Sequence, residues 1–256
     1  MTAPGPIAFL DTNVLFGAIS TDMFLTLAEK DDVMFVPRWS DYVCDELREH
    51  LGERIRVPEG CPDPNAYVVS RVEARIDAMN RAFPHALTSK WRTIVPHVKT
   101  YVRDPDDVQI LAGAVASHAD YLVTCNVSDF DVDGIRRMLG ISVNRPGRFL
   151  SMLFEANNDM FISNMRAMVG SNRRFPHTLE ELHRVLSESP EYRGLAGLIE
   201  DYALKRYRRH ATVRPPYRSA QPRDSKGRFT FIPIRGGDED LDTCGNSFWG
   251  ADGNGF

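Results

Sequence analysis

The sequence has few cysteines and no long apolar run, and both absences restrict what the protein can be. Its 4 cysteines in 256 residues include no Cys-x-x-Cys pair, which argues against a structural zinc site and fits a reducing compartment. No stretch approaches the roughly 18 consecutive apolar residues of a membrane span. The first residues lack the basic segment of a signal peptide. We therefore expect a cytoplasmic protein that does not cross a membrane.

The 7 histidines lack the spacing of a metal site as well. A metal ion, if the protein binds one, would have to be held by oxygen ligands, which favours Mg²⁺ or Mn²⁺. The composition, with 43% hydrophobic and 26% charged residues, is that of an ordinary globular protein with a real core.

Strand-like apolar runs alternate with helical patterns over residues 1–150 and predict an α/β domain with a largely parallel sheet. The expected strands are residues 6–10, 33–36, 121–124 and 141–143. The expected helices are residues 21–30, 40–51 with Ser40 as its cap, 65–82, 107–118 and 131–139. Residues 151–211 predict a helical extension, with helical patterns at about 149–170, 178–187 and 193–207. Residues 212–256, rich in glycine and proline, predict an irregular tail.

Acidic residues occur where the carboxyl ends of two predicted strands should meet. Asp11 follows the first strand directly, and Asp129 lies in the loop after the strand that ends at Thr124. Functional groups gather at this edge of an open parallel sheet. Glu46 and Asp107 come from helices, where they border the apolar stripe and can point inward. Such a carboxylate cluster suits a hard divalent cation, which would polarise a phosphodiester and activate water.

Each acid also has an ordinary structural role open to it. Asp104, with Pro105 next, has the pattern of a helix N-cap, and Asp107 would complement the helix dipole. Asp11 alone would be a turn residue, and Glu46 alone a solvated acid. Only the joint placement of these acids favours a metal site.

At these residues the sequence resembles the PIN-domain nucleases, in particular the VapC-type toxins of bacterial toxin–antitoxin pairs. The similar segments are residues 9–15, 45–47, 104–112 and 122–130. The resemblance covers roughly residues 6–150 and implies a PIN-like α/β/α sandwich. It also implies cleavage of single-stranded RNA with Mg²⁺ or Mn²⁺, a homodimer, and inhibition by a cognate antitoxin.

The resemblance assigns roles to individual residues. The catalytic, metal-binding acids would be Asp11, Glu46, Asp107 and Asp129. Asp104 would replace Asp107 or act beside it. The residues that orient the carboxylates or the attacking water would be Asn13, Thr124 and Asn126.

The net charge of −4 conceals a basic segment near the C-terminal end. It interleaves cationic side chains with tyrosines, which suits phosphate contacts and stacking on unpaired bases of RNA. Its RNA-binding candidates are Lys205, Arg206, Arg208, Arg209 and Arg218. A solvated basic linker is the alternative.

Together these patterns predict a metal-dependent endoribonuclease that hydrolyses phosphodiester bonds of single-stranded or loop RNA, and they favour the toxin of a toxin–antitoxin pair. A PIN-fold nuclease of RNA maturation or decay is the nearest alternative. A different class, a catalytically inactive RNA-binding module, is disfavoured because all four acids are present.

Overall fold

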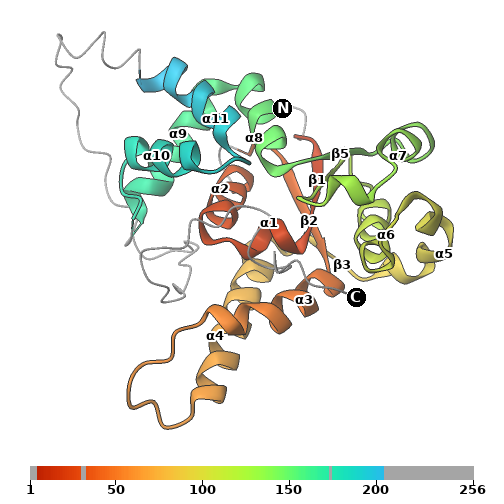
Figure 1. Ribbon diagram of the computed structural model, residues 1–256, viewed down its shortest axis with the longest axis horizontal. Coiled ribbons are helices and arrows are strands. Elements are labelled where there is room, and N and C mark those ends of the chain that lie inside the picture. The colour runs from red at the N-terminus through yellow and green to blue at the C-terminus, as the bar shows by residue number, and fades with distance from the viewer. Residues whose placement is uncertain (1–4, 30–32, 173–174, 205–256) are drawn as a thin grey trace, which may run out of the picture.

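The computed structural model describes residues 5–29, 33–172 and 175–204, and these form a parallel sheet covered by helices (Figure 1). The sheet has five strands in the order β3-β2-β1-β4-β5. The strands are β1 (Ile7–Leu10), β2 (Val36–Ser40), β3 (Leu87–Thr88), β4 (Tyr121–Val123) and β5 (Ser142–Asn144). Every pairing between them is parallel. The α/β class and the parallel sheet predicted from the sequence are confirmed.

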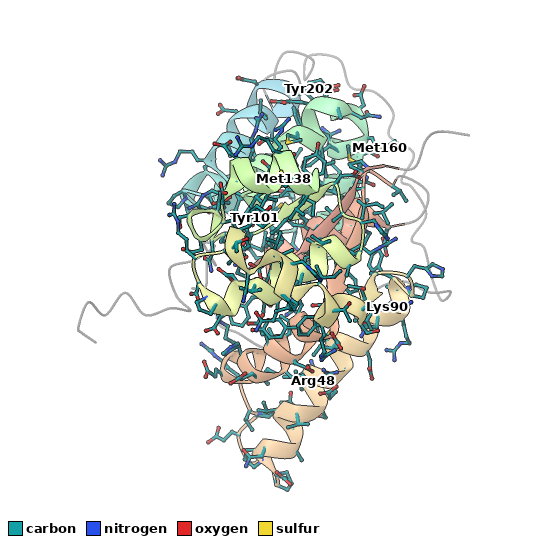
Figure 2. The ribbon with its side chains drawn as sticks, turned by 90° about the vertical axis from the view of Figure 1, so that its right-hand side faces the viewer. Arg48, Lys90, Tyr101, Met138, Met160 and Tyr202 are labelled. Atoms are coloured by element: carbon teal, nitrogen blue, oxygen red, sulfur yellow. The ribbon has the colours of Figure 1, made fainter. Side chains whose placement is uncertain are left out.

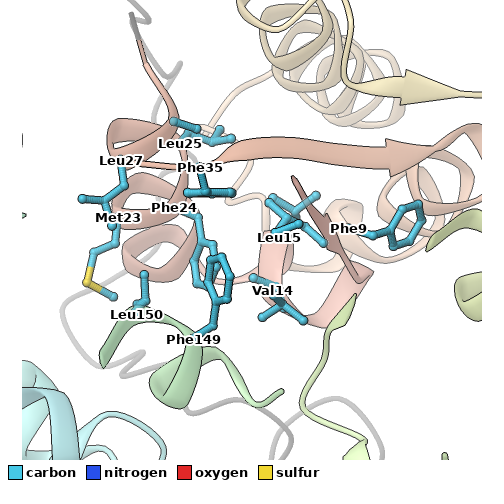
Figure 3. Packing of buried hydrophobic residues seen from close by; sticks show 14 of the residues in the cluster. Phe9, Val14, Leu15, Met23, Phe24, Leu25, Leu27, Phe35, Phe149 and Leu150 are labelled. Carbon is cyan, nitrogen blue, oxygen red and sulfur yellow. The ribbon is translucent and has the colours of Figure 1, made fainter. Parts of the chain in front are cut away.

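Helices lie on both faces of the sheet. On one face, Phe24 of α2 (Ala18–Ala28) stacks on Phe149 of α8 (Pro146–Ala156), with ring centroids 6.0 Å apart. Tyr121 of β4 contacts the same Phe149 ring edge-on. On the other face, the ring of Phe9 in β1 points at α6 (Val108–Ala116). Figure 3 shows Phe24 and Phe149 packed together and Phe9 directed away from them.

The strand register brings the carboxyl ends of β1 and β4 to the same edge of the sheet. Leu10, the last residue of β1, pairs with Val123, the last residue of β4. The next residues, Asp11 and Thr124, therefore emerge side by side. The Asp11 amide also donates to the carbonyl oxygen of Val123 at 3.1 Å, which ties the two ends together.

The second strand lies further along the chain than the sequence predicts. Instead of residues 33–36 it is β2, which pairs with β1 from Val36 onward and runs through Pro37. The missing N–H of Pro37 faces the β3 side of the strand, and β3 pairs only with the later residues Trp39 and Ser40. Proline is tolerated there because no ladder hydrogen bond is lost.

Helix α3 (Asp41–Leu51) begins directly after β2, at the predicted cap. The Ser40 hydroxyl accepts a hydrogen bond from the Val43 amide at 3.2 Å. The next helix, α4 (Pro64–Ala82), and the short α7 (Val132–Leu139) also lie where the sequence predicts them.

The sequence does not predict the short elements. These are α1 (Thr12–Phe16), η1 (Gly52–Arg54), β3, η2 (Lys90–Thr93), α5 (Val95–Val98), η3 (Lys99–Tyr101), η4 (Pro105–Asp107) and η5 (Val127–Asp129). Each has five residues or fewer, which is too short for an apolar repeat to show its period.

The predicted helical extension is present, with a break that the sequence pattern does not reveal. Its helices are α8, α9 (Asn158–Ser171), α10 (Leu179–Glu188), α11 (Arg193–Ile199) and the π-helical η6 (Glu200–Leu204). Asn157 ends α8 and caps α9, since its side chain accepts from the Met160 amide at 3.1 Å. The extension belongs to the same hydrophobic cluster as the sheet. The expected irregular tail, 212–256, lies outside the described residues.

In the described part of the chain, no helix combines the length and apolar character needed to cross a membrane.

Helix α6 approaches β1 unusually closely at Gly113. A Cβ atom on this glycine would lie 2.5 Å from Cζ of Phe9, whose side chain is fully buried. Hydrogen in place of a side chain therefore lets α6 pack against the strand that leads to Asp11.

Replacing this glycine tests the close approach. Gly113→Ala adds helix propensity but forces the buried Phe9 ring to move, so we expect a net loss of about 1–2 kcal/mol in the free energy of unfolding. Gly197→Ala in α11 is the matched control, because a Cβ there meets no atom within 4 Å. It should stabilise the protein by up to about 1 kcal/mol. Urea unfolding of both variants measures the difference; equal stabilisation by both would contradict the packing argument.

Candidate active site at the carboxyl edge of the sheet

Asp11 is a buried carboxylate that nearby donors hold in place. It is 3% exposed and caps α1. Its Oδ1 accepts from the Thr12 amide at 2.6 Å, and its Oδ2 accepts from the Thr124 hydroxyl at 2.6 Å and from Nδ2 of Asn13 at 2.7 Å. Three donors from two strand ends therefore fix the orientation of one carboxylate.

Asn13 and Thr124 also organise the loop that follows β4. Asn13 donates through Nδ2 to the Thr124 hydroxyl at 3.3 Å and accepts through Oδ1 from the Cys125 amide at 3.0 Å. The amide of Asn126 donates to the Thr124 hydroxyl at 3.0 Å. The structure thus places these two residues around Asp11, whereas Asn126 joins the network through its backbone.

Glu46 reaches the same region from α3. Its Oε2 accepts a hydrogen bond from the Thr12 hydroxyl, so it is linked to the residue next to Asp11. Burial raises the pKa of Glu46, although the hydrogen bonds from Thr12 and Tyr42 oppose the rise. The half-buried helix position predicted for Glu46 is the one observed.

Asp107 feels all of the other acidic residues of the region. Burial raises its pKa to about 8, and the negative charges of Asp11, Asp104, Asp129 and Glu46 add to the rise, in that order. Its Oδ2 atom is buried and has no hydrogen-bond partner among the described residues. Asp107 is therefore a crowded carboxylate with an unsatisfied oxygen.

Asp104 and Asp129 lie at the margin of this acidic group. The Asp104 side chain accepts from the Asp106 amide at 3.0 Å and caps η4, with Pro105 at its first turn, which confirms the predicted capping role. The half-buried Asp129 ends η5, and its backbone carbonyl accepts from the Arg103 amide at 2.7 Å.

The electrostatic state of Asp11 reflects the same crowding. Burial raises its pKa to about 7; the hydrogen bond from Thr124 opposes this rise and the charge of Glu46 reinforces it. Three donors would normally hold a carboxylate in its ionised form. At Asp11 the cost of burial is larger than their combined effect.

The donor set agrees with an oxygen-coordinated cation, although it is not closed around one. Within residues 5–29, 33–172 and 175–204, no three Asp, Glu, His or Cys side chains are gathered tightly enough to hold a metal ion. The buried, unpartnered Oδ2 of Asp107 and the raised pKa values of three acids show that the cluster lacks a positive charge. Hard carboxylate oxygens of this kind suit Mg²⁺ or Mn²⁺.

Two residues near the acids carry contacts that the sequence did not indicate. Thr12 bonds Glu46 through its hydroxyl, and Tyr42 lies one helical turn before Glu46 and contacts it. Burial, followed by the charge of Glu46, raises the pKa of the Tyr42 hydroxyl. The four-residue spacing of Tyr42 and Glu46 on one helix was the available signal.

The predicted RNA-binding residues, Lys205, Arg206, Arg208, Arg209 and Arg218, lie outside the described residues. Comparison with protein-family models, curated proteins and solved structures gave no match for this chain.

The raised pKa of Asp107 predicts how metal-free stability depends on pH. Its pKa is about 8 in the folded protein against 3.8 as the ordinary value. Folding therefore favours the protonated form, and the wild type should lose stability as the pH rises from about 4 through 8. Asp107→Asn removes this loss. In EDTA the variant should match the wild type near pH 4 and exceed it by about 1–2 kcal/mol at pH 8, after allowance for solvent screening.

Chemical denaturation at several pH values measures this difference. Asp77→Asn, which alters an exposed acid on α4, is the control and should change stability by less than about 0.5 kcal/mol throughout. A difference between Asp107→Asn and the wild type that stays constant from pH 4 to 8 would show that Asp107 is not strained by its neighbours.

Proposed function

We propose that this protein is a divalent-metal-dependent endoribonuclease with a PIN-type site. The observation that carries the proposal is the electrostatic coupling of Asp107 to Asp11, Asp104, Asp129 and Glu46. These acids come from four separate places in the chain and meet beside the carboxyl edge of a parallel sheet, where open α/β sheets bind their ligands. A stable fold has no need of such mutual repulsion, whereas a cation site does.

The acids of the site would divide the work between them. Asp11, Glu46, Asp107 and Asp129 would hold Mg²⁺ or Mn²⁺, and Asp104 caps its turn beside them. When bound, the cation supplies Lewis-acid polarisation of the phosphodiester and a source of hydroxide at neutral pH. Asn13 and Thr124 keep the Asp11 carboxylate in one orientation, so it needs no rearrangement when the substrate arrives.

The choice of RNA as the substrate rests on the sequence. The resemblance to PIN-domain nucleases indicates single-stranded or loop RNA, and the basic segment that begins at Lys205 suits phosphate and base contacts. The same resemblance supports the finer proposal of a VapC-type toxin that forms a homodimer and is inhibited by a cognate antitoxin. A nuclease of RNA maturation or decay would use the same site.

The activity can be tested on a single-stranded RNA oligonucleotide with Mg²⁺ or Mn²⁺. We expect cleavage that EDTA abolishes, and a loss of at least about 100-fold in Asp11→Asn because an oriented metal-binding carboxylate is removed. Asp45→Asn is the control. Asp45 neighbours Glu46 on α3, but its side chain is 65% exposed and pairs with Arg48, so activity should stay near that of the wild type.

Two results would count against the proposal. Near-normal cleavage by Asp11→Asn would remove Asp11 from the site. A wild-type protein that binds RNA but does not cleave it with either metal would favour the inactive RNA-binding module instead.

A further inference from the structure

Tyr42 occupies a position beside the acids that the proposed function leaves unexplained. It is the second residue of α3, one helical turn before Glu46, and its side chain is half-buried. Its ring meets the indole of Trp91 edge-on, with centroids 5.7 Å apart and an interplanar angle of 68°. The ring is thus packed on one side while its hydroxyl points toward the acidic region.

The hydroxyl of Tyr42 lies between two of the segments that supply the acids. It hydrogen-bonds the carboxylate of Glu46. It also lies 3.5 Å from the carbonyl oxygen of Asp106, the residue before Asp107. A phenol has one proton to donate, and a charged carboxylate is the stronger acceptor of the two. The hydrogen bond to Glu46 therefore dominates.

A network of side chains holds the ring in this place. The indole Nε1 of Trp91 donates to Asp41, the first residue of α3. Arg92 donates to the same carboxylate at 2.9 Å, and its guanidinium carbon lies 4.4 Å from the centroid of the Trp91 ring. Helix η2 is thereby fastened to the start of α3, and Trp91, which is 7% exposed, forms a fixed wall behind Tyr42.

We propose that Tyr42 is a positioning residue of the active site: its hydroxyl holds the Glu46 carboxylate toward the loop that carries Asp104 and Asp107. The inference rests on the proposed nuclease function. Thr12 binds Glu46 from the β1 side and Tyr42 binds it from the α3 side. With both donors in place, the long Glu46 side chain is restricted to one arrangement among the other acids, and the entropy of ordering it is lost on folding and not on binding.

The test uses Tyr42→Phe, which removes the hydroxyl and keeps the ring against Trp91. Tyr202→Phe is the matched control, because the Tyr202 hydroxyl also donates to a carboxylate, that of Asp159 in α9. Tyr202 and Arg48, which shares α3 with Tyr42, lie toward opposite ends of the molecule (Figure 2). The full-length proteins are compared by Mn²⁺ titration calorimetry, by cleavage of a single-stranded RNA oligonucleotide, and by thermal unfolding.

We expect Tyr42→Phe to bind Mn²⁺ about 10-fold more weakly and to lower kcat by a similar factor, because a hydrogen bond to a charged group is lost. KM for RNA should change by less than about 2-fold, since the hydroxyl orients Glu46 and does not bind the substrate. Thermal stability should match that of Tyr202→Phe, which should keep the Mn²⁺ affinity and kcat of the wild type.

The outcomes separate this inference from the proposed function. If the wild type binds Mn²⁺ and cleaves RNA while Tyr42→Phe does both equally well, the positioning role is wrong and the nuclease stands. Equal losses in Tyr42→Phe and Tyr202→Phe would likewise overturn it, since the effect would not be local to the site. A wild type that neither binds Mn²⁺ nor cleaves RNA overturns the proposed function and this inference together.

Discussion

Repulsion between carboxylates at the end of β1 is the interaction that the surrounding structure has to accommodate. Parallel strands end at one edge, so Asp11 after β1 emerges beside the loop that follows β4. Burial then makes the repulsion stronger, because charges interact more strongly away from water. The raised pKa values of Asp11 and Asp107, about 7 and about 8, are the consequence. Hydrogen bonds from neighbouring residues orient these acids without removing the repulsion, which a bound cation would do.

The packing around the acids is rigid enough to maintain this unfavourable arrangement. Gly113 brings α6, the helix that follows Asp107, against the ring of Phe9 in β1. From the other direction, the buried Arg75 of α4 donates to the carbonyl oxygen of Leu15 and to the hydroxyl of Thr21, each at 3.0 Å. The long α4 is thereby fastened to α1, the helix that Asp11 caps. Both contacts restrain the segments that carry the acids, which limits how far the carboxylates can move apart.

The sequence predicts those parts of the molecule that have a long repeat or a local hydrogen-bonding pattern. Helix α4 shows its apolar period over 19 residues, and the caps at Ser40 and Asp104 follow from side-chain chemistry alone. The same reasoning places Asp11 at the edge of the sheet and Thr124 beside it. It does not find β3 or η2, because elements of two to four residues have no measurable period. The support of Tyr42 by Trp91 is beyond its reach for another reason. It depends on how a segment 50 residues away packs, as the bond from Trp91 to Asp41 shows.

Asp11 and Asp107 share a raised pKa but differ in how they are held, and the difference suggests separate tasks in the proposed nuclease. Asp11 accepts three hydrogen bonds, so its orientation is set before any ligand arrives. Asp107 has a buried oxygen without a partner among the described residues and is surrounded by like charges. An unsatisfied buried oxygen costs about 1–3 kcal/mol, and more if it is charged. A ligand that contacts Asp107 recovers that free energy on binding. Asp11 therefore suits the fixed reference point of the site, and Asp107 suits the group that gains most when a cation binds.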